Sequence, residues 1–397
     1  MKRMDKMNRP LLIRSCLAIL LAGLIVVVGI VATVSLSPQL AAQGADLLRP
    51  LIGPKSVAKM EDIVFKIQDT VTQLEFKLGR ITPSVPWQIA AVTQSSQSGN
   101  SPGSTQDSTT ALAPSANRWM PLPVPPLGSL AGEGAWTPYM QDATGATVAY
   151  RTFLQPDPQR PYVVVGVVAF DLTRIRLHYV VGTKEPKVSG GHKAPGIIPA
   201  ADRASGILLA AFNGGFRTIN GHFGVMYKGS VLIAPILNMA TVALYRDGSI
   251  RIGEWGNDLK YSQDMVTYRQ NCKLMVQNGA VDPLVYDNSV NNWGYTIKGS
   301  GVTSRSGLGI SQDGKVLYYF AGPSLTMPIL AKAMQDAGAY QAMQLDINNT
   351  KVYFSSFKFD NGQLVAIPLL PQNMVYDINR FLGPSSRDFF YITASNP

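Results

Sequence analysis

Cysteine, histidine and charged residues are scarce in this sequence, and each shortage excludes a class of protein. Two cysteines cannot form a disulfide framework, and none of the three histidines has metal-ligand spacing. Only 15% of the residues are charged against 46% hydrophobic, and no basic patch with interleaved aromatic residues occurs. We therefore expect a folded chain without metal, cofactor or nucleic-acid partner, in which Cys272 is a buried thiol rather than a nucleophile.

One long uncharged stretch lies near the N-terminus, between residues 15 and 45. Within it the apolar residues 17–36 are numerous enough to span about 30 Å of hydrocarbon as a helix. Residues 1–14 carry five Lys or Arg and one Asp, so they should stay in the cytoplasm. We expect residues 15–36 to be a transmembrane anchor and the main domain to be periplasmic or extracellular. A cleaved signal peptide is the alternative, although its apolar region is usually shorter.

An amphipathic pattern follows at residues 55–80, where apolar residues recur at spacings of three and four. This spacing predicts a helix with a heptad stripe. The stripe has two interpretations: a short coiled coil that forms a homodimer through residues 57–78, or a helix docked on its own domain or on lipid headgroups. Its members are Val57, Met60, Val64, Ile67, Val71, Leu74 and Leu78.

Residues 81–135 have the composition of a linker. Thr93 to Thr110 contain no apolar residue and one charge, so they cannot bury a core. Four prolines between residues 121 and 126 stiffen the chain that follows. We expect a flexible linker over 81–135 and one globular domain over 136–397.

Short strand-like segments dominate this domain. Residues 162–170 form a continuous apolar run rich in β-branched side chains, which predicts a buried strand. Helical pattern is rarer, and the best example, residues 328–337, begins with Pro and stops at Gly338. The sequence predicts a mixed α/β or α+β fold: a strand-rich single domain with few helices, preceded by the anchor and the heptad helix.

Three segments carry residues suited to chemistry. The first is a strand that ends in Asn213-Gly214-Gly215, where an amide side chain lies beside backbone that a ligand can approach closely. In the second, Arg305 precedes a glycine-spaced strand and could bind phosphate or carboxylate. The third places Asp346 at the end of a strand, followed by the amide side chain of Asn348.

The order of these segments resembles the phosphodiester glycosidase family, which includes N-acetylglucosamine-1-phosphodiester α-N-acetylglucosaminidase. In that family a strand ending in N-G-[GS]-[FY] precedes a strand with R-[TS]-x-[ILV]-G and a helix that leads to L-D-G-G-G-S. Residues 213–216, 305–309 and 326–346 fit this order. The chain departs from the last motif, because Ile347-Asn348-Asn349-Thr350 replaces Gly-Gly-Gly-Ser. Asn tolerates the left-handed backbone that glycine adopts, so we expect the turn to survive.

The resemblance implies hydrolysis of a sugar-1-phosphodiester or a related envelope glycan linkage. It assigns the phosphate to Arg305 and the base or nucleophile to Asp346, while Asn213, Gly214, Gly215 and Asn348 bind substrate. Glu254, with Asp264 in reserve, is our candidate for a second catalytic carboxylate. The alternatives are a glycan- or phosphodiester-binding protein without catalysis, which the change at Ile347 would explain, and a structural envelope protein.

Overall fold

The computed structural model describes residues 38–87, 119–188, 191, 194–287, 293, 301–348 and 350–395. The expected anchor, residues 15–36, lies outside these ranges. Among the described residues, none of the helices combines the length and the hydrophobicity needed to cross a membrane.

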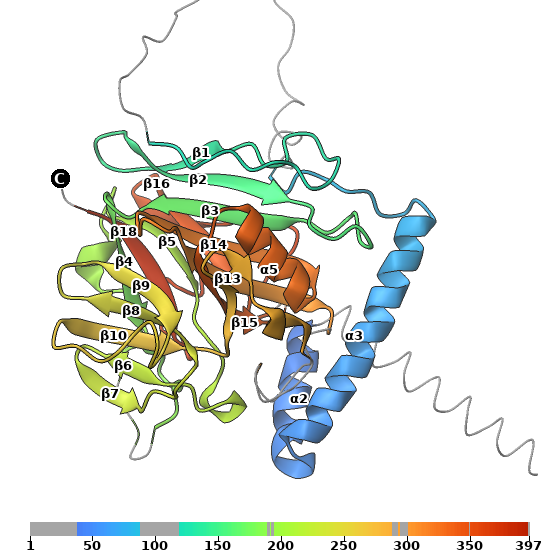
Figure 1. The fold of residues 1–397 in the computed structure, drawn as a ribbon, viewed down its shortest axis with the longest axis horizontal. Helices are drawn as coiled ribbons and strands as arrows, with labels where there is room; N and C mark the ends of the chain where they lie inside the picture. The colour runs from blue at the N-terminus through green and yellow to red at the C-terminus, as the bar shows by residue number, and fades with distance from the viewer. Residues whose placement is uncertain are drawn as a thin grey trace, which may run out of the picture.

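Most of the described chain is β-structure, arranged in three sheets (Figure 1). The largest sheet has eight strands, in the order β1 (Thr137–Gln141), β2 (Thr147–Leu154), β3 (Val165–Asp171), β14 (Val316–Leu325), β13 (Thr303–Ile310), β15 (Gln341–Ile347), β11 (Leu274–Gln277) and β12 (Ala280–Val281). A five-stranded sheet follows the order β7 (Ser230–Ile233), β6 (Val225–Tyr227), β10 (Met265–Gln270), β8 (Ala240–Tyr245) and β9 (Ile250–Glu254). The other contains β17 (Gln363–Pro368), β16 (Phe354–Asp360), β5 (Leu208–Asn213), β18 (Phe389–Ala394) and β4 (Ile175–Val180).

The sequence prediction of a strand-rich domain with few helices is confirmed. The apolar run at 162–170 becomes β3, whose residues are all buried because its two faces lie in two different hydrophobic cores. The predicted helix is α5 (Met327–Asp336), which ends where Gly338 takes a φ of 93°. Every pairing between named strands is antiparallel, as in an α+β fold. Short 3-10 helices cover Ala200–Arg203, Thr218–Asn220 and Pro283–Tyr286.

Two hydrophobic cores hold the layers together. One core joins the three sheets and contains Phe212 of β5, Ile252 of β9 and Leu345 of β15. The second lies under α5, which packs on the eight-stranded sheet through β11, β13 and β14 (Figure 1). Strands β5, β13 and β15 are thus fixed by apolar burial on both sides of the sheets.

The folded part begins before residue 136. Residues 119–135, which we placed in the linker, pack on the domain: Val124 is buried in the core under α5, and Trp119 contacts the same core. Glu133 is buried and accepts hydrogen bonds from the backbone of Leu127, Gly128 and Gln155. Buried carboxylates need such donors, so this segment is part of the domain.

Two helices precede the domain, α2 (Pro38–Ile52) and α3 (Pro54–Lys77). They contact each other, and Arg49 of α2 forms an ion pair with Glu61 of α3 at 2.8 Å. The helix predicted over 55–80 is therefore present. Figure 1 shows α3 running along the outer edge of the molecule.

Candidate active site

Three strands from two sheets bring the predicted motifs together. Asn213 ends β5, Ser306 lies next to Arg305 in β13, and Asp346 lies near the end of β15. Asn213 Nδ2 donates to Ser306 Oγ at 2.9 Å, and Ser306 Oγ donates to the backbone oxygen of Asp346 at 2.9 Å. Residues far apart in the chain therefore converge at one place, as the motif order predicts.

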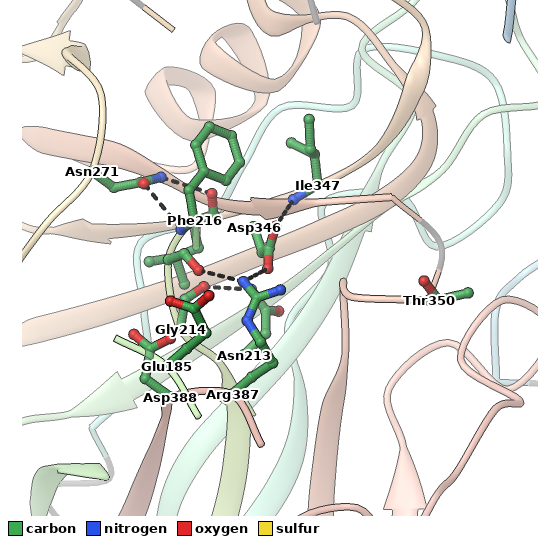
Figure 2. A network of polar contacts seen from close by, with 12 residues as sticks. Glu185, Asn213, Gly214, Phe216, Asn271, Asp346, Ile347, Thr350, Arg387 and Asp388 are labelled. Atoms are coloured by element: carbon green, nitrogen blue, oxygen red, sulfur yellow. Dashed lines mark hydrogen bonds and ion pairs between the residues drawn. The ribbon is translucent and has the colours of Figure 1, made fainter. Parts of the chain in front are cut away.

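An irregularity in β15 determines where Asp346 points. Arg305 pairs with Ile347 and Gly307 with Gln344, so β15 has one residue more than β13 between these pairs. Such a bulge re-aims side chains and is common beside active sites. Ile347 packs into the core under α5 and points away from Arg387 in Figure 2, so it does not obstruct the region around Asp346.

A cavity of about 460 Å³ opens beside these strands. Its lining combines polar residues from β5 and β15 with the loops that precede β16 and β18. The lining residues are Asn213, Gly214, Asp346, Thr350, Lys351, Asp377, Arg380, Phe381, Pro384, Ser385, Ser386, Arg387 and Asp388. With three acidic and three basic residues, the cavity can hold an anion beside a carboxylate.

The carboxylate of Asp346 is largely buried, with 8% of the residue exposed. Its Oδ1 accepts from the backbone N–H of Ile347 at 2.9 Å, and its Oδ2 accepts from Arg387 Nη2 at 2.6 Å (Figure 2). Burial raises the pKa of Asp346, and the positive charge of Arg387 only partly offsets this effect. A shifted pKa in a cavity is typical of functional carboxylates.

Arg387 is the cation nearest this acid. Its Nη2 also donates to the carbonyl of Gly215 at 3.0 Å, and its backbone N–H donates to Ser385 Oγ at 3.2 Å. Its Nε is buried and has no hydrogen-bond partner among the described residues. A buried donor without a partner is costly, which makes this nitrogen available to an anionic ligand.

A second carboxylate, Asp388, lines the same cavity. Its Oδ2 accepts from Arg269 Nε at 2.7 Å and from the Tyr179 hydroxyl at 2.8 Å, and both ionic side chains are at most 2% exposed. Its Oδ1 is buried without a hydrogen-bond partner among the described residues. One oxygen thus anchors the carboxylate, while the other can accept a hydrogen bond from a ligand.

Asn213 has a supporting role in this geometry. Its Oδ1 accepts from the Tyr319 hydroxyl and from the backbone N–H of Tyr353, both at 3.0 Å. Its Nδ2 donates to Ser306 and to the carbonyl of Gly214. Because these bonds use both ends of the amide, Asn213 fixes the strand end rather than offering free groups to a substrate.

The glycines behind Asn213 allow a close approach of the chain. A Cβ on Gly214 would lie 2.7 Å from the carbonyl oxygen of Asp388, and the Gly214 N–H donates to that same oxygen at 3.1 Å. A Cβ on Gly215 would lie 3.0 Å from the Arg269 guanidinium. Glycine is required here because the β5 end packs directly on the residues that hold the second carboxylate.

Arg305 does not reach the cavity, which corrects our expectation that it binds phosphate. The residue is 1% exposed, and its three guanidinium nitrogens donate to the carbonyls of Leu325 and Gly301 and to Gln344 Oε1. Burial lowers its pKa to about 10. Because β13 lies in the middle of the sheet, the Arg305 side chain is buried and its hydrogen bonds connect separate backbone segments.

Two other predicted residues also lie apart from the cavity lining. Glu254 accepts a hydrogen bond from Asn257 at the end of β9, and Asp264 lines a different surface groove. The carboxylates that join Asp346 in the cavity lining are instead Asp377 and Asp388. Asn348 adopts the left-handed φ of 77° expected of it, but its Oδ1 faces Thr303 Oγ1, 3.4 Å away.

Cys272 is a free, buried thiol, as predicted, and burial raises its pKa. Gln344 Nε2 lies 3.8 Å from its sulfur. Among the described residues, no group of His, Cys, Asp or Glu has an arrangement that could hold a metal ion.

Arg387, Asp388 and the other cavity residues of the C-terminal loops were not predicted from the sequence. They belong to no motif, because residues 377–388 precede β18 as irregular chain. The available signal was an Arg-Asp pair directly before the apolar run Phe389–Ala394. Charged residues directly before a buried strand lie at the edge of the sheet, where functional groups can face a cavity.

The protein is thus a strand-rich domain with a polar cavity, in which the acid Asp346 contacts the cation Arg387. Residues 207–359 match the model of the phosphodiester glycosidase family, so the resemblance inferred from the motifs is confirmed for this region. No curated protein matches the sequence.

Among solved structures, one match is the catalytic domain of zebrafish N-acetylglucosamine-1-phosphodiester α-N-acetylglucosaminidase, auto-inhibited by its pro-peptide. It is 15% identical, with a TM-score of 0.37 over 68% of this chain and 96% of that one. A hypothetical protein from Synechocystis is 12% identical, with a TM-score of 0.40 over 63% of each chain. The matched part thus spans less than two thirds of the Synechocystis protein.

Proposed function

We propose that this protein hydrolyses a sugar-1-phosphodiester or a related glycan linkage of the cell envelope. The observation that carries the proposal is the contact between Asp346 and Arg387 inside the cavity. The family match over residues 207–359 supports the class of reaction.

The reaction separates the sugar from its phosphate at the anomeric carbon. Water adds to this carbon, the bond from carbon to the phosphate oxygen breaks, and a phosphate monoester leaves as a stable anion. A leaving group of this kind needs less protonation than an alcohol, so the protein must mainly hold the phosphate and supply a carboxylate.

Each requirement has a residue at the cavity. Asp346 acts as base or nucleophile at the anomeric centre, for which it must be ionised. Arg387 takes the phosphate through its Nε and Nη groups, and Lys351 adds positive charge to the same lining. Asp388 accepts a sugar hydroxyl at Oδ1, the oxygen that Arg269 and Tyr179 leave unused.

The activity can be tested on a panel of α- and β-linked sugar-1-phosphodiesters with the purified full-length chain. We expect release of reducing sugar and phosphate monoester, and a fall of roughly 10³-fold in kcat for Asp346→Asn. Asp264→Asn and Glu254→Gln are matched controls that remove carboxylates elsewhere, and they should retain turnover within about 2-fold of wild type.

Other outcomes would support different functions. Saturable binding of the phosphodiesters without turnover would indicate a non-catalytic binding protein. The absence of both binding and turnover would indicate a structural envelope protein. Turnover unchanged in Asp346→Asn would remove this acid from the mechanism.

We further propose that residues 15–36 tether this domain outside the cytoplasm. The proposal rests on the length of the uncharged stretch and on the five basic residues before it. The mass of the protein extracted from membranes tests it: an intact N-terminus indicates an anchor, whereas cleavage near Ala42 or Gly44 indicates a signal peptide.

A further inference from the structure

Helix α3 has two faces with different environments. Its inner face contacts the domain: Phe65 packs on the core under α5, Asp69 pairs with Arg160, and the rings of Phe76 and Tyr162 lie 5.1 Å apart. Phe65, Asp69 and Phe76 are spaced by four and seven residues, so they share one side of the helix. The domain therefore occupies this side.

The opposite side of α3 carries a second apolar stripe. Its exposed members range from 42% exposure at Met60 to 59% at Leu78. Together with the half-buried Ile67, they follow one another at spacings of three and four residues, as in a coiled-coil seam. We call these six residues the outer stripe: Met60, Ile63, Ile67, Val71, Leu74 and Leu78. Large apolar side chains that repeat along an exposed helix face mark an interaction surface.

We propose that the outer stripe pairs with the α3 helix of a second copy of this chain, in parallel orientation. The heptad pattern in the sequence has two interpretations, pairing with a second helix or docking on the chain's own domain. In the structure, the residues suited to each interpretation lie on opposite faces of α3. Docking on the chain's own domain uses Phe65 and Phe76. The outer stripe is turned away from this contact and retains the spacing that suits a helix partner.

The charges beside the outer stripe favour a second α3 over other partners. One flank carries exposed Lys59, Lys66 and Lys77, whereas the other carries Glu61 and Glu75. Lys66 also pairs with Asp62, and Glu61 with Arg49, within the chain. Across a parallel helix pair, the basic flank of one copy faces the acidic flank of the other. In an antiparallel pair, like flanks would meet and repel each other.

The position of the uncharged N-terminal stretch agrees with the parallel arrangement. Residues 15–45 lead directly into the helical hairpin of α2 and α3. A parallel pair places these stretches of both copies on the same side of the dimer. An antiparallel pair would place them at opposite ends.

Disulfide trapping in the full-length chain tests the pairing. In a Cys16→Ser background, Leu74→Cys should form a disulfide with its own counterpart, because seam residues of a parallel pair meet across the axis. Lys66→Cys is the matched control, because this exposed flank position faces away from its counterpart. We expect at least 10-fold more cross-linked dimer for Leu74→Cys than for Lys66→Cys.

Mass measurement supplies the second test. Light scattering of the chain in detergent should give twice the monomer mass of 42.9 kDa, and Val71→Glu with Leu74→Glu should halve it. Leu47→Glu with Leu51→Glu removes apolar residues of α2 that are more exposed than Val71 and Leu74, and it should leave the dimer intact. Thermal unfolding of each variant confirms that the fold persists.

Three results would overturn the proposal. The first is a monomer, and the second is equal cross-linking at positions 66 and 74. The third is a dimer that survives Val71→Glu with Leu74→Glu, because it must form through another segment. If the variants in α2 and α3 instead reduce binding to liposomes of a monomeric chain, the surface that α3 contacts is lipid.

Discussion

Arg305 and Arg387 both lie near the candidate active site, but their surroundings differ. Arg305 is in β13, at the centre of the eight-stranded sheet, and donates only to oxygens of the protein. Arg387 lies in a loop before β18, lines the cavity, and holds the catalytic candidate Asp346. Both are charged, but only Arg387 can transfer its hydrogen bonds to a substrate.

The difference shows how this domain divides its polar residues. Strands β5 and β13 contribute groups whose hydrogen bonds are already satisfied, such as Asn213 and Ser306. The loop before β18 contributes buried atoms without partners among the described residues, Arg387 Nε and Asp388 Oδ1. Polar groups on β5 and β13 therefore shape the site, whereas Asp346 of β15 and the loop residues Arg387 and Asp388 are available for chemistry.

The largest expected effect is on stability, at Arg305. Arg305→Met keeps the length of the side chain but leaves three buried oxygens without their donor. At about 1–3 kcal/mol for each unsatisfied group, we expect a loss of about 4 kcal/mol in the free energy of unfolding. Urea denaturation measures this loss, and the KM of the folded fraction should be unchanged.

The same substitution at Arg387 should show the opposite pattern. Arg387→Met removes the contacts proposed for phosphate, so kcat/KM should fall about 10²-fold, which corresponds to about 2.7 kcal/mol. The free energy of unfolding should change by less than in Arg305→Met, since the Arg387 side chain is 20% exposed. If both variants change only stability, the division between scaffold and site is wrong.

A smaller effect concerns the pH dependence of hydrolysis. Burial raises the pKa of Asp346 and Arg387 opposes this rise. Because the acid must be ionised to act, kcat/KM should fall as the pH drops through this pKa, above the ordinary value of about 3.9. Removing the cation raises the pKa further, so the acidic limb of Arg387→Met should move to higher pH.

The matched control for this shift is Lys332→Met, which removes an exposed cation on α5 and should leave the limb in place. An acidic limb that moves downward in Arg387→Met would contradict the electrostatic assignment. Arg387→Lys should keep the limb near its wild-type position because the positive charge remains.

Much of this arrangement could be predicted from the sequence where periodicity or a motif was present. Buried β3, helix α5 and the convergence of Asn213 with Asp346 follow from apolar runs, helix-end signals and motif order. Arg305 was misjudged because sequence spacing does not tell whether a side chain faces a cavity or a carbonyl. Arg387 was missed because loop residues have no period, and only tertiary packing places them.

The smallest expected effect tests the turn where the family motif has glycine. Asn348 adopts a φ of 77°, which costs a residue with a plain Cβ about 1–2 kcal/mol and glycine almost nothing. Asn348→Ala should therefore lower the free energy of unfolding by about 1 kcal/mol, whereas Asn348→Gly should be nearly neutral. Because its side chain faces Thr303 and lies outside the cavity lining, neither variant should change kcat by more than about 2-fold. A large loss of kcat in Asn348→Gly would instead place the Asn348 amide in contact with the substrate and extend the site from the loop before β18 to the end of β15.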